Sequence, residues 1–154
     1  MAKYVAGRHT ADIEGDFVVF IIGARINKPW RAIRAMRALG NLNKMVKDLA
    51  QKPEKGLLHA ESAGFVSIQY WRSFDDLERF AKDPDPHMKQ WRKYTKLAHK
   101  TGEAGIWHET FLVKAGQYEA IYNNMTPRGL AKAGTFVSIK DSSHARGRVG
   151  SPTA

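Results

Sequence analysis

The stretch DFVVFIIGARIN, residues 16–27, constrains the fold more strongly than any other part of this chain. Its apolar residues are consecutive, so a β-strand formed here has apolar side chains on both of its faces. Such a strand lies in the middle of a sheet and is covered on both sides. If helices cover only one face of that sheet, something else must cover the other face.

Hydrophobic periodicity and turn residues predict the order of the remaining elements. The first 15 residues are expected to form an irregular arm, and a helix is expected after the central strand, where apolar residues recur every three or four positions. Further helices are expected at residues 73–83 and 87–102, and strands at 57–62, 65–71, 105–113, 116–124 and, more briefly, 135–139. The last two long strands are close enough in sequence to form a hairpin.

This order predicts an α+β fold, with a ferredoxin-like antiparallel sheet and helices on one face. The second apolar face of the central strand then stays open, and we expect a second copy of the chain to cover it, giving a homodimer. Residues 1–139 are predicted to form one domain with an N-terminal arm. Residues 140–154, basic and rich in Gly and Ser, are predicted to be a flexible or partner-docked tail.

Composition narrows the classes of partner. The chain has 154 residues, no cysteine and a formal net charge of +10. Without cysteine it has neither disulfides nor thiolate-held metals, which fits a cytoplasmic protein. The charge is typical of nucleic-acid binding, but no zinc-finger, RNP or helix-turn-helix pattern accompanies it, so we do not expect that partner. The longest apolar run, residues 17–22, is too short to span a bilayer, and no membrane partner is expected.

The stretch GIWHETFLV, residues 105–113, places two polar side chains next to each other in a predicted strand. Neighbouring strand residues point to opposite faces, so either His108 or Glu109 faces an interior. His108 is then either a core histidine, bonded for example to Tyr118 or Tyr122, or an acid or base in a pocket.

A second histidine, His87, follows Pro86 at the start of a predicted helix. The positive end of a helix favours a neutral imidazole, which suits a base or an iron ligand. The alternative is a surface histidine. The spacing of the histidines does not predict a metal site made of protein ligands alone.

Aromatic residues accompany these histidines and suggest an apolar pocket for a small molecule, although each of them alone is also typical of an ordinary core. The predicted pocket residues are Tyr70, Trp71, Trp91, Tyr94, Tyr118 and Tyr122.

Five stretches, taken together and in this order, resemble a bacterial and fungal family of monooxygenase-like proteins. They are GRHTADIEGDFVVFIIGARINKPW, EKGLL, QYWRSFDDLERFAKDPDPHMKQW, GIWHETFLVKAGQYEAIYNNM and RGLAKAG. That family is similar to the dimeric α+β barrel superfamily, which includes antibiotic-biosynthesis monooxygenases, haem-degrading monooxygenases, chlorite-dismutase-like proteins and aldoxime dehydratases. The resemblance implies that each of two subunits contributes a ferredoxin-like sheet and a pocket between sheet and helices.

The resemblance also implies roles for particular residues. His87 follows Leu77 by ten positions, the spacing at which haem-degrading relatives have an iron-ligating histidine, although those relatives have a tryptophan in place of Leu77. We therefore expect an oxidoreductase of monooxygenase type that acts on a small aromatic or polyketide-like molecule, with or without haem. The catalytic candidates are His87 and His108, and His87 is the candidate haem ligand. The alternatives are a haem-dependent, aldoxime dehydratase-like lyase and a non-enzymatic module that binds haem or a small molecule.

Overall fold

The structure, a computed structural model, describes residues 4–84, 86–139 and 144–149. Within these ranges, the side chains of residues 35, 38–43, 86–88, 90, 91, 93 and 97 lie outside the description.

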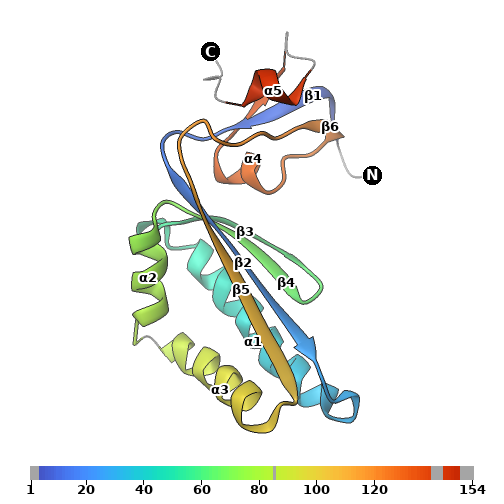
Figure 1. The fold of residues 1–154 in the computed structure, drawn as a ribbon, viewed down its shortest axis with the longest axis vertical. Coiled ribbons are helices and arrows are strands. Elements are labelled where there is room, and N and C mark those ends of the chain that lie inside the picture. The colour runs from blue at the N-terminus through green and yellow to red at the C-terminus, as the bar shows by residue number, and fades with distance from the viewer. Residues whose placement is uncertain (1–3, 85, 140–143, 150–154) are drawn as a thin grey trace.

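Four strands form the larger sheet, which is antiparallel and has the order β3-β4-β2-β5. They are β2 (Phe17–Ile26), β3 (Leu57–Ala63), β4 (Val66–Trp71) and β5 (Ala104–Val113). The helical elements that connect them are η1 (Pro29–Arg31), α1 (Ala32–Ala50), η2 (Pro53–Lys55), α2 (Phe74–Lys82) and α3 (Pro86–Thr101). This arrangement confirms the predicted α+β, ferredoxin-like sheet (Figure 1). The described strands do not close a barrel within one chain.

The central strand β2 is buried on both faces at its start, in agreement with its sequence. Val18 packs on the helix side against Leu49 of α1 and Leu77 of α2. Phe17 packs on the opposite side against Ala11 and Leu130. Part of the second face is therefore covered by the chain itself, through segments at its two ends.

Those end segments form a second, smaller antiparallel sheet with the order β6-β1-β7. It contains β1 (Val5–Asp12), β6 (Tyr122–Met125) and β7 (Thr135–Ser138), with the short helix α4 (Leu130–Ala133) between the last two strands. Figure 1 shows this sheet and α4 together at one end of the molecule, beyond the larger sheet. The short strand predicted near residues 135–139 is thus confirmed.

Two sequence predictions about this region were wrong. The N-terminal arm is not irregular, because residues 5–12 form the middle strand of the small sheet. Residues 116–124 do not form a hairpin with β5, because β6 pairs with β1, where Arg8 lies opposite Asn123. The chain turns away from the larger sheet after β5, and Asp16 holds this turn by accepting a hydrogen bond of 2.9 Å from the backbone N–H of Ala115.

The described part of the C-terminal segment is bound to its own chain. Residues 145–148 form a short helix, α5 (Ala145–Arg148), and the Nε of Arg148 donates a 2.8 Å hydrogen bond to the carboxylate of Glu119. Residues 140–143 and 150–154 of the predicted tail lie outside the described residues. Among the helices that the structure describes, none has the length and apolar run needed to cross a bilayer.

Candidate functional site

A cavity of about 550 Å³ lies between the helix-facing side of the larger sheet and helices α1, α2 and α3. The sheet contributes alternate residues of β2 and β5, such as Phe20, Ile22 and Ile106. The helices contribute mainly apolar side chains, such as Met45 and Leu77. The size and the apolar walls are typical of a site for a small molecule.

His108 is one of the few polar residues that line this cavity. It lies opposite Ile22 in the ladder between β2 and β5, so it points to the helix side of the sheet. Its imidazole ring lies 5.5 Å from the ring of Phe20, and the residue is exposed. Glu109 lies opposite Ile21 and points to the other face of the sheet. The structure thus places His108 in a solvent-accessible cavity wall and not in a closed core.

Tyr94 of α3 is the second polar group of interest in the cavity lining. The residue is 1% exposed and packs near Ala104 and Ile106. Its hydroxyl has no hydrogen-bond partner among the described residues. A buried hydroxyl without a partner costs free energy, so a ligand that reaches this group would gain a hydrogen bond. Burial also raises the pKa of Tyr94, which keeps the phenol protonated as a donor.

Gln69 of β4 is a polar lining residue whose position depends on its neighbours. The indole N–H of Trp71 donates a 3.1 Å hydrogen bond to the side-chain oxygen of Gln69. Trp71 itself is fully buried and packs against the ring of Phe80 at 5.4 Å. Trp71 therefore belongs to the core beneath the cavity and positions Gln69.

Three of the predicted pocket tyrosines lie on the opposite side of the larger sheet, away from this cavity. The hydroxyl of Tyr118 accepts a 2.9 Å hydrogen bond from the backbone N–H of Ile13. The hydroxyl of Tyr122 accepts one of 3.2 Å from Ala131, and Tyr70 packs in the same apolar cluster. Desolvation raises the pKa of all three tyrosines. In the structure, these residues attach the small sheet and α4 to the larger sheet.

Two further predicted site residues, His87 and Trp91, lie within α3. Their side chains are outside the described residues, so their predicted roles stay predictions.

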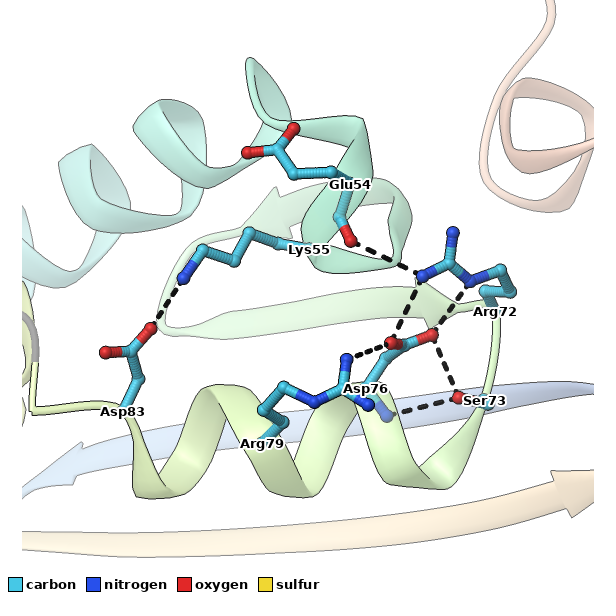
Figure 2. A network of polar contacts seen from close by, with 7 residues as sticks. All are labelled: Glu54, Lys55, Arg72, Ser73, Asp76, Arg79 and Asp83. Carbon is cyan, nitrogen blue, oxygen red and sulfur yellow. Dashed lines mark hydrogen bonds and ion pairs between the residues drawn. The ribbon is translucent and has the colours of Figure 1, made fainter.

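A network around Asp76 positions helix α2, which forms one wall of the cavity (Figure 2). Asp76 is 4% exposed, and its carboxylate accepts hydrogen bonds of 2.9 Å from both Arg72 and Arg79. Ser73 caps the helix, because its hydroxyl accepts a 3.1 Å hydrogen bond from the backbone N–H of Asp76. The hydrogen bond from Arg72 holds the pKa of Asp76 below its usual value.

The same network connects α2 to the turn that precedes β3. Arg72 also donates a 3.4 Å hydrogen bond to the carbonyl of Glu54, and Lys55 forms a 2.6 Å ion pair with Asp83 at the end of α2 (Figure 2). These contacts fix both ends of α2 against the η2 turn and so fix the wall that holds Leu77.

A metal site built from protein ligands is not present in the described part of the chain, where no group of three or more His, Asp or Glu side chains could hold an ion. The titratable groups in the described cavity lining are the imidazole of His108, the phenol of Tyr94 and the carboxylate of Glu78 in α2. The other polar side chains of the lining are those of Ser67, Gln69 and Thr110.

The sequence prediction missed several cavity residues, among them Phe20, Met36 and Gln69. The alternation of β2 contains the signal for Phe20, since it shares a face with Val18 and Ile22. Gln69 could have been noticed as a buried amide within an aromatic strand, which requires a hydrogen-bond partner.

The sequence of this chain is similar to that of one protein family and of one curated protein. A protein-family model described as Monooxygenase af470-like matches residues 17–130. The curated protein Monooxygenase af470 of Aspergillus fumigatus is 32% identical over 151 residues, a match that covers 82% of this chain and 54% of that protein. The chain thus spans about half the length of this curated relative.

Solved structures add a likeness of fold. The crystal structure of aldoxime dehydratase matches 90% of this chain and 43% of its own chain, with a TM-score of 0.58 and 17% identity. A conserved protein of unknown function from Bacteroides thetaiotaomicron, described as a possible oxidoreductase, matches 65% of this chain and 99% of its own, with a TM-score of 0.40 and 16% identity. At these identities the first match supports the fold alone, and the second is too weak to support a conclusion.

Proposed function

This chain belongs to the monooxygenase af470-like family, and from that premise we propose that it oxidises a small aromatic or polyketide-like molecule in the cavity between sheet and helices. The family membership confirms the resemblance seen in the sequence and supports a monooxygenase type of function. The observation that carries the proposal is a cavity of about 550 Å³ with apolar walls, in which His108 and Tyr94 supply an imidazole and an unpartnered hydroxyl.

The proposed reaction begins with His108, whose imidazole takes a proton from an acidic C–H or O–H group of the substrate. The resulting anion is electron-rich, and the hydroxyl of Tyr94 donates a hydrogen bond that stabilises it. The mainly apolar walls place few competing polar groups around this anion, while His108 itself stays accessible to solvent. Molecular oxygen then oxidises it. For an activated methylene group, CH₂ and O₂ give C=O and H₂O, which balances without an external reductant.

The resemblance to haem-degrading monooxygenases and aldoxime dehydratases implies haem as a cofactor. The described cavity lining does not fit a haem group. Two lining residues, His108 and Tyr94, have side chains of the kinds that ligate haem iron. However, the described lining contains no lysine or arginine to pair with the two propionates, and its carboxylate, Glu78, has the same charge as they do. We therefore assign no step to haem.

The test is oxygen uptake by the purified protein with a panel of phenolic and polyketide-like molecules. We expect uptake that falls by roughly 10²-fold or more in His108→Gln, since a positioned general base contributes about that much. His99→Gln is the control, because His99 is exposed on α3 and does not line the cavity. Tight binding without uptake would leave only a binding module.

An absorption spectrum of protein expressed with added haem is the matching test for the cofactor. A Soret band, together with activity that depends on it, would replace the cofactor-free reaction by haem chemistry, including the aldoxime dehydratase-like alternative. A colourless protein that still consumes oxygen is the expected outcome.

The protein is also proposed to act as a homodimer, joined through the part of the second sheet face that α4 leaves uncovered. Trp107 and Phe111 of β5 lie on that face and are 43% and 49% exposed. Ile21 of β2 and Ile68 of β4 are cross-strand partners on the same face. An apolar face of this kind is typical of an interface between subunits.

A further inference from the structure

Helix α1 does not bury its whole apolar stripe. Met45 and Leu49 in its C-terminal half are buried against the sheet. Trp30 of the preceding η1 turn, with Ile33 and Met36 at the start of α1, are instead 78%, 71% and 55% exposed. We name these three residues the α1 apolar row. Exposed side chains of this size, spaced three residues apart on one side of a helix, are rarely left in water without a function.

A basic row runs beside the α1 apolar row. Arg34 and Arg37 are exposed, and they follow Trp30 and Ile33 by four residues, so each basic side chain is a neighbour of an apolar one on the helix surface. The sequence between residues 28 and 47 contains six lysines and arginines and no acidic residue. Arg31 forms a 3.7 Å ion pair with Glu103, so the surface is amphipathic and takes its positive charge from the other basic residues, Arg34 and Arg37 among them.

The α1 apolar row reaches the cavity through its last member, Met36. Met36 belongs to the row and also lines the cavity, as does Phe65 in the turn between β3 and β4, which is 46% exposed. Figure 1 shows that η1 and the start of α1 lie at the end of the molecule opposite the small sheet. A partner bound to the α1 apolar row therefore lies next to the proposed substrate site.

We propose that this end of the protein docks on an anionic lipid membrane, with the α1 apolar row inserted among the acyl chains and the basic row on the headgroups. Tryptophan and aliphatic side chains beside arginines are the composition of interfacial helices, which lie in the membrane plane and do not span it. The expectation of no membrane partner was based on the lack of a spanning segment, and interfacial binding needs none.

The charge of this surface argues against the other occupants. A second copy of the chain would bring an identical basic row to the same place, and the two rows would repel each other. A partner protein needs a surface of roughly 800 Å² per side, more than a row of three side chains offers. The lipid proposal does not depend on the proposed oxidation, because membrane binding is measured without substrate.

The test is co-sedimentation of the full chain with vesicles of phosphatidylcholine, with and without phosphatidylglycerol. We expect binding to the vesicles that contain phosphatidylglycerol, weakened by salt, and a blue shift of tryptophan fluorescence that Trp30→Phe removes. Trp30→Ser with Ile33→Ser, and separately Arg34→Glu with Arg37→Glu, should each weaken binding by about tenfold or more.

Two control variants match these changes elsewhere on the surface. Leu112→Ser removes an apolar side chain that is 68% exposed on β5, and Lys52→Glu with Lys132→Glu makes an equal change of charge at exposed positions. Both should leave vesicle binding within about twofold. The proposal is overturned if the native chain does not bind anionic vesicles, or if the controls weaken binding as much as the test variants. It is also overturned if Trp30→Ser with Ile33→Ser changes the mass of the protein in light scattering, which would indicate a second copy on this surface.

Discussion

The backbone of Gly56 lies against the carboxyl group of Asp76, so closely that a Cβ atom at residue 56 would stand 2.4 Å from the Cγ of Asp76. This contact joins the turn before β3 to the first turn of α2. The contact requires glycine for two reasons. A side chain at residue 56 would collide with Asp76, and the φ of +87° at this residue is one that glycine adopts without strain. The position of one cavity wall therefore rests on a residue without a side chain.

Gly56→Ala is expected to lower the free energy of unfolding by roughly 2–4 kcal/mol, from backbone strain and from displacement of the Asp76 carboxylate. Gly64→Ala is the control, since Gly64 has a φ of +58° but no atom within 4 Å of the added Cβ. It should lose only the strain contribution of about 1 kcal/mol. Urea denaturation of both variants measures the difference, and equal losses would contradict the importance of the contact.

The stability of the protein should depend on the ionisation of Asp76. Hydrogen bonds from Arg72 hold the folded-state pKa of Asp76 below the usual 3.8, so the ionised carboxylate stabilises the fold above that pH. This stabilisation is lost as the pH falls through the folded-state pKa. Asp76→Asn should lower the free energy of unfolding at pH 7 by roughly 1–3 kcal/mol. The difference from the native chain should shrink below about pH 4.

Denaturation curves at a series of pH values test this prediction. Asp16→Asn is the control, because Asp16 pairs with Lys114 at an exposed position and should contribute less. A difference between Asp76→Asn and the native chain that stays constant down to pH 2 would show that the charge of Asp76 is not the cause.

Tyr94→Phe should separate ligand binding from stability. The variant loses a hydroxyl that has no partner among the described residues, so the free energy of unfolding should stay the same or rise slightly. Affinity for a phenolic ligand should fall by about tenfold, the usual effect of one lost hydrogen bond. Tyr118→Phe is the matched control, because Tyr118 bonds the backbone of Ile13 outside the cavity. It should leave ligand affinity unchanged and lower stability by about 1 kcal/mol. Isothermal titration and urea denaturation give both quantities.

Phe111→Asp should dissociate the proposed dimer. Phe111 shares its sheet face with Trp107, whereas the next residue, Leu112, points to the helix side and is even more exposed. Burying a carboxylate in an apolar interface should weaken association by roughly thirtyfold or more. Leu112→Asp should leave it unchanged. Light scattering across a range of concentrations distinguishes the two variants, and a native chain that is monomeric at micromolar concentration would rule out the dimer.

The larger sheet could be predicted because its signals are local. The apolar run of β2, the alternation of β3 and β4 and the Ser73 cap of α2 each lie within a few residues of the structure they specify. The small sheet could not be predicted in this way. The hydroxyl of Thr10 bonds the carbonyl of Ala120, a partner 110 residues away, and no local pattern in the arm reveals it.

The candidate site was only partly accessible from the sequence. Strand alternation showed that His108 and Glu109 face opposite ways, but the register with Ile22 was needed to show which of them faces the helices. Tyr118 and Tyr122 have the spacing of residues on one strand face, yet the chain leaves the larger sheet before it reaches them. The hydroxyl of Tyr94 has no hydrogen-bond partner among the described residues because of how the chain packs, and no sequence pattern predicts this.

The middle position of β1 in the small sheet has a consequence for synthesis on the ribosome. All four strands of the larger sheet have been made once Val113 leaves the exit tunnel. By contrast, β1 precedes these four strands in the chain, and both of its neighbours, β6 and β7, come from residues 122–138. Strand β1 therefore stays without its partners until residues 122–138 have emerged, so the small sheet can fold only after the strands of the larger sheet are available.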